Sequence, residues 1–320
     1  MKLGVFTVLF SGQPLEKALD YICESGLEAV EIGVGGYPGN AHCPVEELLA
    51  SKTKAAEYKK RITGRGLVIS ALSCHGNPLH PDAAAAKRDR ETHRKAVRLA
   101  EMLGVKVVVN FSGCPGGGPK DTTPNWITCP WPPDFGDALQ WQWEKKLIPF
   151  WTEEAKFAKD HGVVIGFEMH PGFPVHSTET LLKLRKACGP TLGANFDPSH
   201  LFWQGMDPLV SLKALGKAVF HVHAKDCRID PENTAMNGVL DTKNYGDILN
   251  RSWVFRTVGY GHGEGFWRDF VSTLRVIGYD GAISIEHEDG LMSVNEGFQK
   301  AVAFLKGILL TEKPGGMWWA

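Results

Sequence analysis

VVIGFEMHP, residues 163–171, begins as a strand and ends in a glutamate and a histidine. The run is almost wholly apolar up to Phe167, which is typical of a parallel strand covered on both faces. A loop and a helical stretch follow it. The segment therefore predicts one β-strand/α-helix unit with polar side chains at the carboxyl end of its strand.

The same unit recurs along the chain. The predicted strands are Leu3–Val8, Ala29–Gly33, Leu67–Leu72, Val105–Phe111, Val163–Met169, Leu192–Asp197, Ala218–Ala224 and Ala282–His287. The predicted helices are Leu15–Ser25, Val45–Thr63, Ala83–Leu103, Ala138–His161, Thr178–Ala187, Pro208–Leu215, Gly265–Ile277 and Val294–Leu310. Several of these helices end at a glycine, the usual helix-stop residue.

Eight such units in 320 residues predict an α/β protein with one domain, residues 1–320, folded as a closed (β/α)8 TIM barrel. A doubly wound open sheet is the alternative. It usually carries a glycine-rich turn after its first strand, whereas Phe10–Pro14 reads FSGQP.

Two long loops and the C-terminal tail stand outside this repeat. The loops are predicted after the fourth strand, residues 112–137, and after the seventh, residues 226–261. Both fall on the face where barrel active sites are built. The tail, residues 313–320, ends in MWWA, and exposed tandem tryptophans are unfavourable. We expect the tail to dock on the barrel or on a partner subunit of a homo-oligomer.

The composition narrows the class of protein. Lys plus Arg total 35 and Asp plus Glu total 36, so a nucleic-acid partner is not expected. No apolar run reaches the roughly 18 residues that a membrane span needs. The seven cysteines form no Cys-x-x-Cys pair, which predicts reduced thiols and a cytoplasmic location. A bridge between Cys114 and Cys129, which share one loop, is the alternative.

Polar residues gather at the ends of the later strands. Glu168, Asp197, His223 and Glu286 end four of them. Each alone has a plain structural interpretation, such as a buried ion pair. In a closed barrel, however, these four ends converge, and buried carboxylates need a partner charge or a metal. The set predicts one divalent cation. Mn²⁺ is favoured, with Mg²⁺, Co²⁺ or Zn²⁺ as alternatives.

Five segments resemble the xylose-isomerase-like TIM barrels, a family of sugar isomerases and epimerases that also includes dehydratases and endonuclease IV. They are residues 167–171, 197–200, 221–226, 278–281 and 285–288. The resemblance covers nearly the whole chain. It implies that Glu168, Asp197, His223 and Glu286 are the metal ligands. It also implies that His200, Arg228 and His75 face the substrate.

The resemblance implies a metal-dependent isomerase or epimerase acting on a small carbohydrate. Glu168 and Glu286 would be the catalytic residues, moving a proton next to a carbonyl through an enediolate. His200, Arg228 and His170 would stabilise the developing oxyanion. His262 is either a substrate ligand or a loop residue. His221 is expected to pack in the core.

Three alternatives stay open. A lyase or dehydratase acting on a 3-oxo-glycoside or keto-polyol, including C-glycoside cleavage, would begin with the same proton abstraction. The tryptophans between 126 and 143 favour such a larger substrate, unless they only pack the lid. An endonuclease IV-like nuclease is disfavoured, because Asn110 stands where that branch places a histidine. A non-enzymatic binding module would leave the four ligands without a role.

Overall fold

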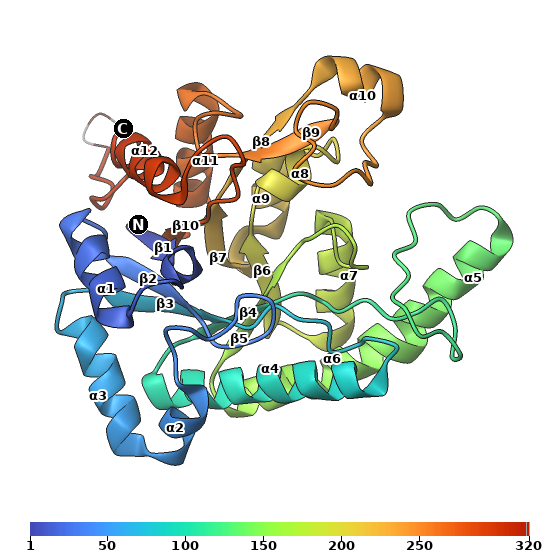
Figure 1. Ribbon diagram of the computed structural model, residues 1–320, viewed down its shortest axis with the longest axis horizontal. Helices are drawn as coiled ribbons and strands as arrows, with labels where there is room; N and C mark the ends of the chain where they lie inside the picture. The colour runs from blue at the N-terminus through green and yellow to red at the C-terminus, as the bar shows by residue number, and fades with distance from the viewer. Residues whose placement is uncertain (318, 320) are drawn as a thin grey trace.

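A closed barrel of eight parallel strands forms the centre of the molecule (Figure 1). The computed structural model describes residues 1–317 and 319. Around the barrel the strands follow the order β1, β10, β7, β6, β5, β4, β3, β2. Their bounds are β1 Lys2–Phe6, β2 Ala29–Gly33, β3 Val68–Ser73, β4 Val107–Asn110, β5 Val164–Glu168, β6 Leu192–Phe196, β7 Val219–Ala224 and β10 Ala282–Ile285. The predicted TIM barrel is therefore confirmed.

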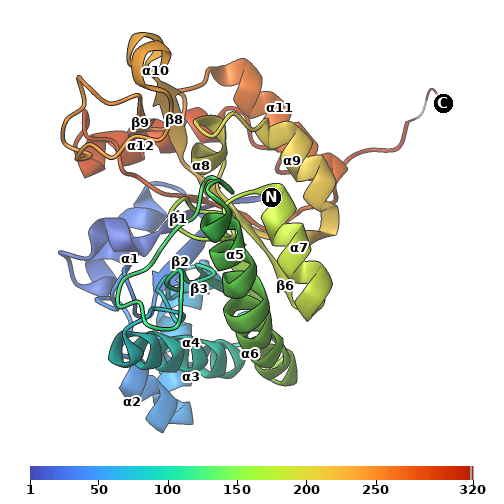
Figure 2. The same cartoon turned by 90° about the vertical axis from the view of Figure 1, so that its right-hand side faces the viewer.

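Helices surround the barrel, as Figures 1 and 2 show. They are α1 Leu15–Glu24, α2 Val45–Ala50, α3 Lys52–Thr63, α4 Ala83–Leu103, α5 Pro133–Trp141, α6 Ile148–Asp160, α7 Thr178–Cys188, α8 Ser199–Phe202, α9 Pro208–Leu215, α10 Pro231–Asn237, α11 Glu264–Val276 and α12 Val294–Lys306. Short 3-10 turns cover Thr7–Phe10 and Gly216–Ala218, and a π-helical turn covers Gln142–Leu147. The core lies between the strands and the inner faces of these helices.

Several elements differ from the predicted ones in their bounds, and three of these differences have a clear local cause. The first strand ends at Phe6, because a 3-10 turn begins at Thr7. The predicted helix Val45–Thr63 is split at Ser51, whose extended backbone and side-chain bond to the Lys54 N–H start α3 afresh. The helix expected from Ala138 begins at Pro133 instead, which is a favoured first helical residue.

The segment after β7 is ordered rather than a simple loop. It forms an antiparallel hairpin of β8, Asp226–Ile229, and β9, Trp253–Arg256, with α10 between them. Arg251 is buried there and donates hydrogen bonds to the carbonyl oxygens of Trp253 and Lys243. Trp253 stacks on Trp203 with ring centroids 4.5 Å apart. These contacts fix the hairpin above the barrel mouth.

The segment after β4 is also held in place. Gln142 donates from Nε2 to the carbonyl oxygens of Gly116, at 3.0 Å, and Asn125, at 2.7 Å. Trp126 packs edge-on against His176, whereas Trp131 is 71% exposed. The long connection is thus fastened to the π-helical turn between α5 and α6.

The C-terminal segment and the cysteines are the remaining features of the fold. The segment before residue 318 leads away from the barrel (Figure 2), and Met317 and Trp319 are 67% and 70% exposed. Docking of the tail on the barrel or on a partner subunit stays a prediction, and Trp318 and Ala320 lie outside the described residues. All seven cysteines are free, so Cys114 and Cys129 form no bridge. No described helix has both the length and the apolar character to span a membrane.

Candidate active site

Four ligand-type side chains meet at the carboxyl ends of β5, β6, β7 and β10. Each of Glu168, Asp197, His223 and Glu286 offers one atom, and these atoms all lie within 4.8 Å of one another. The Nδ1 atom of His223 lies 3.0 Å from a carboxylate oxygen of Glu286 and 3.3 Å from one of Glu168. The barrel closure thus brings together residues that are 118 positions apart in the sequence, from 168 to 286.

The chemistry of this cluster suits a divalent cation. Glu31, Glu168, Asp197 and Glu286 place four carboxylates around His223 and the single buried ammonium of Lys225. The buried Oδ2 atom of Asp197 has no hydrogen-bond partner among the described residues, although the Lys225 ammonium lies 3.1 Å away. Burial would lower the pKa of His223, but the carboxylates of Glu31 and Glu286 raise it well above its usual value. The site therefore attracts positive charge.

Glu31 is a functional candidate that the sequence analysis missed. It is fully buried on β2, and its two oxygens lie 3.0 and 2.9 Å from Nε2 of His223. Burial opposes its ionisation, yet His223 and His221 lower the pKa of Glu31 to about 2. An ionised Glu31 accepts a hydrogen bond from the Nε2–H of His223, so Nδ1, which faces Glu168 and Glu286, is the atom that would ligate a metal. The available signal was a single acid inside the apolar run Ala29–Gly33.

Lys225 and Glu288 were also missed. The ammonium of Lys225 lies 3.0 Å from Glu286 and 3.2 Å from Glu288. Burial would lower the pKa of Lys225, but the charges of Asp197, Glu286 and Glu288 raise it well above its usual value. The available signal was alternation, because residues 221, 223 and 225 point to one side of the strand.

Three of the predicted substrate residues lie at the cluster. His200 and His75 hold the two oxygens of Glu168, each through Nε2, at 2.9 and 3.0 Å. His170 packs on His200 with ring centroids 4.2 Å apart, and burial lowers the pKa of His170 to about 3. These histidines fix the Glu168 carboxylate from two sides.

Arg228 and His262 are not brought to the cluster. The strand β8 turns away from the barrel, so Arg228 pairs with Val254 in the hairpin and its side chain is exposed. His262 binds Asp226 through Nδ1 at 2.8 Å and stacks on Phe202 at 3.6 Å. Neither lines the central cavity, where Lys225 supplies the positive charge.

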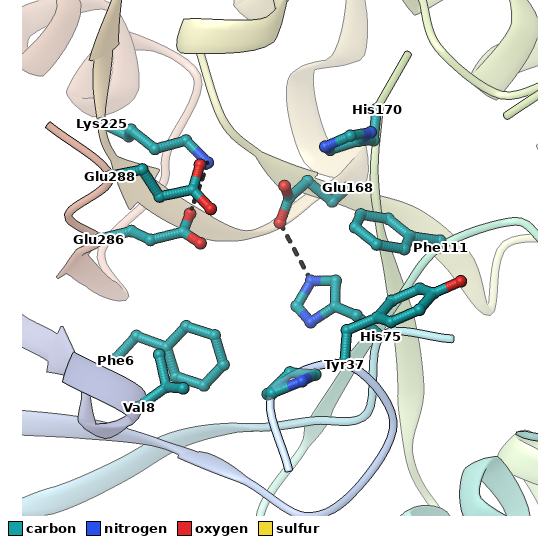
Figure 3. A pocket seen from close by; sticks show the side chains of 11 residues that line it. Phe6, Val8, Tyr37, His75, Phe111, Glu168, His170, Lys225, Glu286 and Glu288 are labelled. Carbon is teal, nitrogen blue, oxygen red and sulfur yellow. Dashed lines mark hydrogen bonds and ion pairs between the residues drawn. The ribbon is translucent and has the colours of Figure 1, made fainter. Parts of the chain in front are cut away.

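A cavity of 190 Å³ opens onto the cluster (Figure 3). One side, which we call the charged wall, comes from the ends of β5, β7 and β10 and consists of Glu168, His170, Lys225, Glu286 and Glu288. The facing side, which we call the aromatic wall, comes from the ends of β1 to β4 and consists of Phe6, Val8, Tyr37, Pro38, His75 and Phe111. None of the tryptophans from 126 to 143 is among the described residues that line the cavity, so the sequence argument for a larger substrate finds no support here.

The fold is that of a TIM barrel, and the carboxylate–histidine cluster at its mouth could hold a metal ion. Residues 19–308 match the family described as xylose isomerase-like TIM barrel. The chain belongs to this family.

Relatives extend this assignment. The uncharacterized protein YfiH of Bacillus subtilis is 40% identical over 309 residues, which is 96% of this chain and 98% of the relative. An inosose dehydratase of Clostridium tetani is 32% identical over 111 residues, which is 30% of this chain and 37% of the relative.

Solved structures share the fold along almost the entire chain. The probable 3-DHS dehydratase AsbF of Bacillus anthracis has a TM-score of 0.66 at 17% identity, covering 96% of this chain and 99% of the other. A D-tagatose 3-epimerase-like protein has a TM-score of 0.63 at 22% identity, covering 96% and 98%. The IolI protein with a bound zinc atom has a TM-score of 0.64 at 19% identity, covering 97% and 98%. At these identities the likeness shows the fold.

Proposed function

We propose that this protein is a divalent-metal-dependent sugar isomerase or epimerase that moves a proton next to a carbonyl group. The observation that carries the proposal is the meeting of Glu168, Asp197, His223 and Glu286 beside a cavity of 190 Å³, which Glu168 and Glu286 line. That volume is below the roughly 300 Å³ at which pockets for drug-sized ligands begin, so it suits a molecule of monosaccharide or cyclitol size.

These four residues would hold the metal, with Mn²⁺ as the first choice because oxygen ligands outnumber nitrogen. A metal ion in this position polarises the carbonyl of a bound substrate and makes the neighbouring C–H acidic. The IolI protein, which shares the fold, carries zinc, and this supports a bound metal in this protein.

Proton transfer falls to Glu168 and Glu286. Both belong to the charged wall, and their carboxylates point toward each other (Figure 3). One would remove the proton, giving an enediolate, and the other would return it on the opposite face. His75 and His200 fix Glu168, while Lys225 fixes Glu286, so both carboxylates are oriented before the substrate arrives.

A dehydratase is the second candidate, and Lys225 is the observation that favours it. Its buried ammonium lines the cavity between Glu286 and Glu288. After abstraction of the C–H proton, an ammonium in this position can protonate a hydroxyl that leaves from the adjacent carbon as water. The local match to an inosose dehydratase supports the same elimination.

The test is proton exchange in D₂O. The protein with Mn²⁺ is incubated with a panel of ketoses and keto-cyclitols, and the products are read by NMR. The proposal expects deuterium next to the carbonyl with at least one substrate. An epimerised product supports the first candidate, and an unsaturated product supports the second.

Variants make the test specific. Glu286→Gln removes one base and should lower exchange by about 10²–10⁴-fold, the usual contribution of a positioned acid–base group. The exposed Glu264→Gln on α11 is the matched control and should exchange like the wild type. Turnover that carries no deuterium would contradict the proposal, since a hydride shift requires no base.

A further inference from the structure

A second cavity adjoins the metal cavity. It has a volume of 260 Å³. One side comes from β9 and the segment just before β9, and the other side comes from the loop after β10. Glu288 lines both cavities, so they meet at this side chain. We call the second cavity the annex.

Apolar side chains dominate the annex. Tyr245 and Ile248 come from the segment before β9, Phe255 from β9 itself, and Leu291 from the loop after β10. Tyr245 and Leu291 are 58% and 59% exposed, which is unfavourable for large apolar residues unless something covers them. The annex therefore offers an apolar surface directly beside a polar catalytic cavity.

The charged groups of the annex are already neutralised. Arg256 binds Asp289 at 3.0 Å, and Asp289 also accepts from the backbone N–H groups of Thr257 and Leu291 at 2.8 and 2.9 Å. Glu288, at the junction, is paired with Lys225. No cation is left to bind an anion, and the acidic junction repels one, so the annex suits an uncharged group.

Phe255 separates the two cavities and belongs to both surroundings. The Lys225 ammonium lies 4.8 Å from its ring centroid, and the His200 ring meets it edge-on at 5.4 Å. The Tyr245 ring stacks on it at 5.9 Å, within the annex. The side of Glu288 that faces away from the charged wall is thus lined by aromatic and aliphatic side chains.

We propose that the annex binds an uncharged apolar substituent, of benzene-ring size, on a substrate whose polar ring lies in the metal cavity. The natural substrate class is then a keto-glycoside or keto-cyclitol ether, which keeps the carbonyl that the proposed proton transfer needs, rather than a free sugar or a phosphosugar. This inference rests on the proposed function, because it takes the metal cavity as the place of reaction.

The experiment compares paired probes on the Mg²⁺-loaded protein. The probes are the phenyl and methyl β-D-glucopyranosides and the phenyl and methyl β-D-galactopyranosides, titrated by calorimetry. We expect the phenyl compound of at least one pair to bind about tenfold more tightly, because the ring removes apolar surface from water. Saturation-transfer NMR should show the phenyl protons in contact with protein.

Leu291→Asp places a charge in the annex at an exposed position and should abolish the phenyl preference while leaving methyl glycoside binding unchanged. Leu240→Asp, 61% exposed and outside the annex lining, is the matched control and should keep the preference. Equal binding within both pairs, absence of binding by all four probes, or a preference that survives Leu291→Asp would overturn the inference. Proton exchange on free carbonyl substrates is scored separately, so loss of the phenyl preference with intact exchange refutes the annex alone.

Discussion

The two walls of the central cavity differ in what their strands contribute. The charged wall brings two carboxylates, a third at its rim, a lysine and a histidine from the ends of β5, β7 and β10. The aromatic wall brings mainly rings and aliphatic groups from the ends of β1 to β4. The barrel presents both at one height, so their difference lies in the residues and not in the backbone. Under the proposed function, the charged wall would perform the chemistry and the aromatic wall would shape the space above it.

The residues behind each wall support this division. Behind the charged wall, Glu31 contacts His223 of the metal-ligand set through its charge. Behind the aromatic wall, Phe111 stacks on Phe173 at 4.6 Å, and His93 contacts Asn110 at the end of β4. Changes behind the first wall should therefore alter metal binding, and changes behind the second should alter stability or substrate fit.

The largest expected effect comes from the ligand set. Asp197→Asn keeps the side-chain size but removes a charge that buried Lys225 and the metal would share. We expect metal affinity to fall by at least about 10²-fold and kcat/KM by about 10³-fold, measured by calorimetry and proton exchange. Asp134→Asn, exposed on α5, is the control. If kcat/KM of Asp197→Asn lay within tenfold of the wild-type value, the assignment of the chemistry to the charged wall would be wrong.

The next effect concerns acid stability behind the aromatic wall. Burial lowers the pKa of His93 to about 4, against about 6.5 in an unfolded chain. Below pH 6.5 His93 binds a proton in the unfolded chain but stays neutral in the folded protein. The free energy of unfolding therefore falls as the pH drops toward 4. The total loss is about 3 kcal/mol. Denaturant unfolding at several pH values should show a shallower loss for His93→Gln than for the wild type.

The exposed Gln140→Asn on α5, which exchanges one neutral amide for another, is the control for that series and should keep the wild-type slope. An unchanged pH slope in His93→Gln would show that His93 already binds a proton in the folded state. The side behind the aromatic wall would then carry charge, and the contrast between the walls would weaken.

A third prediction concerns Glu31, which does not line the cavity. Glu31→Gln keeps an acceptor near His223 but loses the charge that fixes its proton on Nε2. We expect metal affinity to fall about 10–100-fold, the usual effect of removing a carboxylate behind a metal-bound histidine. The measurement is a metal competition titration, and wild-type affinity would mean that His223 is oriented without Glu31.

The smallest expected effect is on substrate fit. Phe111→Leu removes part of the aromatic wall while the metal-binding residues stay in place. We expect KM to rise about three- to tenfold with kcat and metal affinity nearly unchanged, because the lost contacts bind substrate and transition state alike. Phe135→Leu, 44% exposed on α5, is the control. A fall in kcat without a change in KM would show that the aromatic wall takes part in the chemical step, which contradicts the division between the walls.

The sequence predicted the features that follow from the repeated pattern of apolar strands and helices. Eight apolar runs gave the barrel, and the positions of Glu168, Asp197, His223 and Glu286 at strand ends gave the cluster that the structure brings together. Arg228 could not be placed, because its direction depends on the hairpin pairing of β8 with β9. The roles of Glu31 and Lys225 at the site could not be predicted, because their partners lie as many as 192 residues away in the sequence.

One measurement tests the central claim most directly. A crystal of the protein grown with Mn²⁺ is analysed by anomalous scattering, which locates the metal independently of the protein atoms. The account predicts one Mn²⁺ per chain, bound by Glu168, Asp197, Nδ1 of His223 and Glu286. No peak there, or a peak held instead by Glu31, His221 and His223, would contradict it.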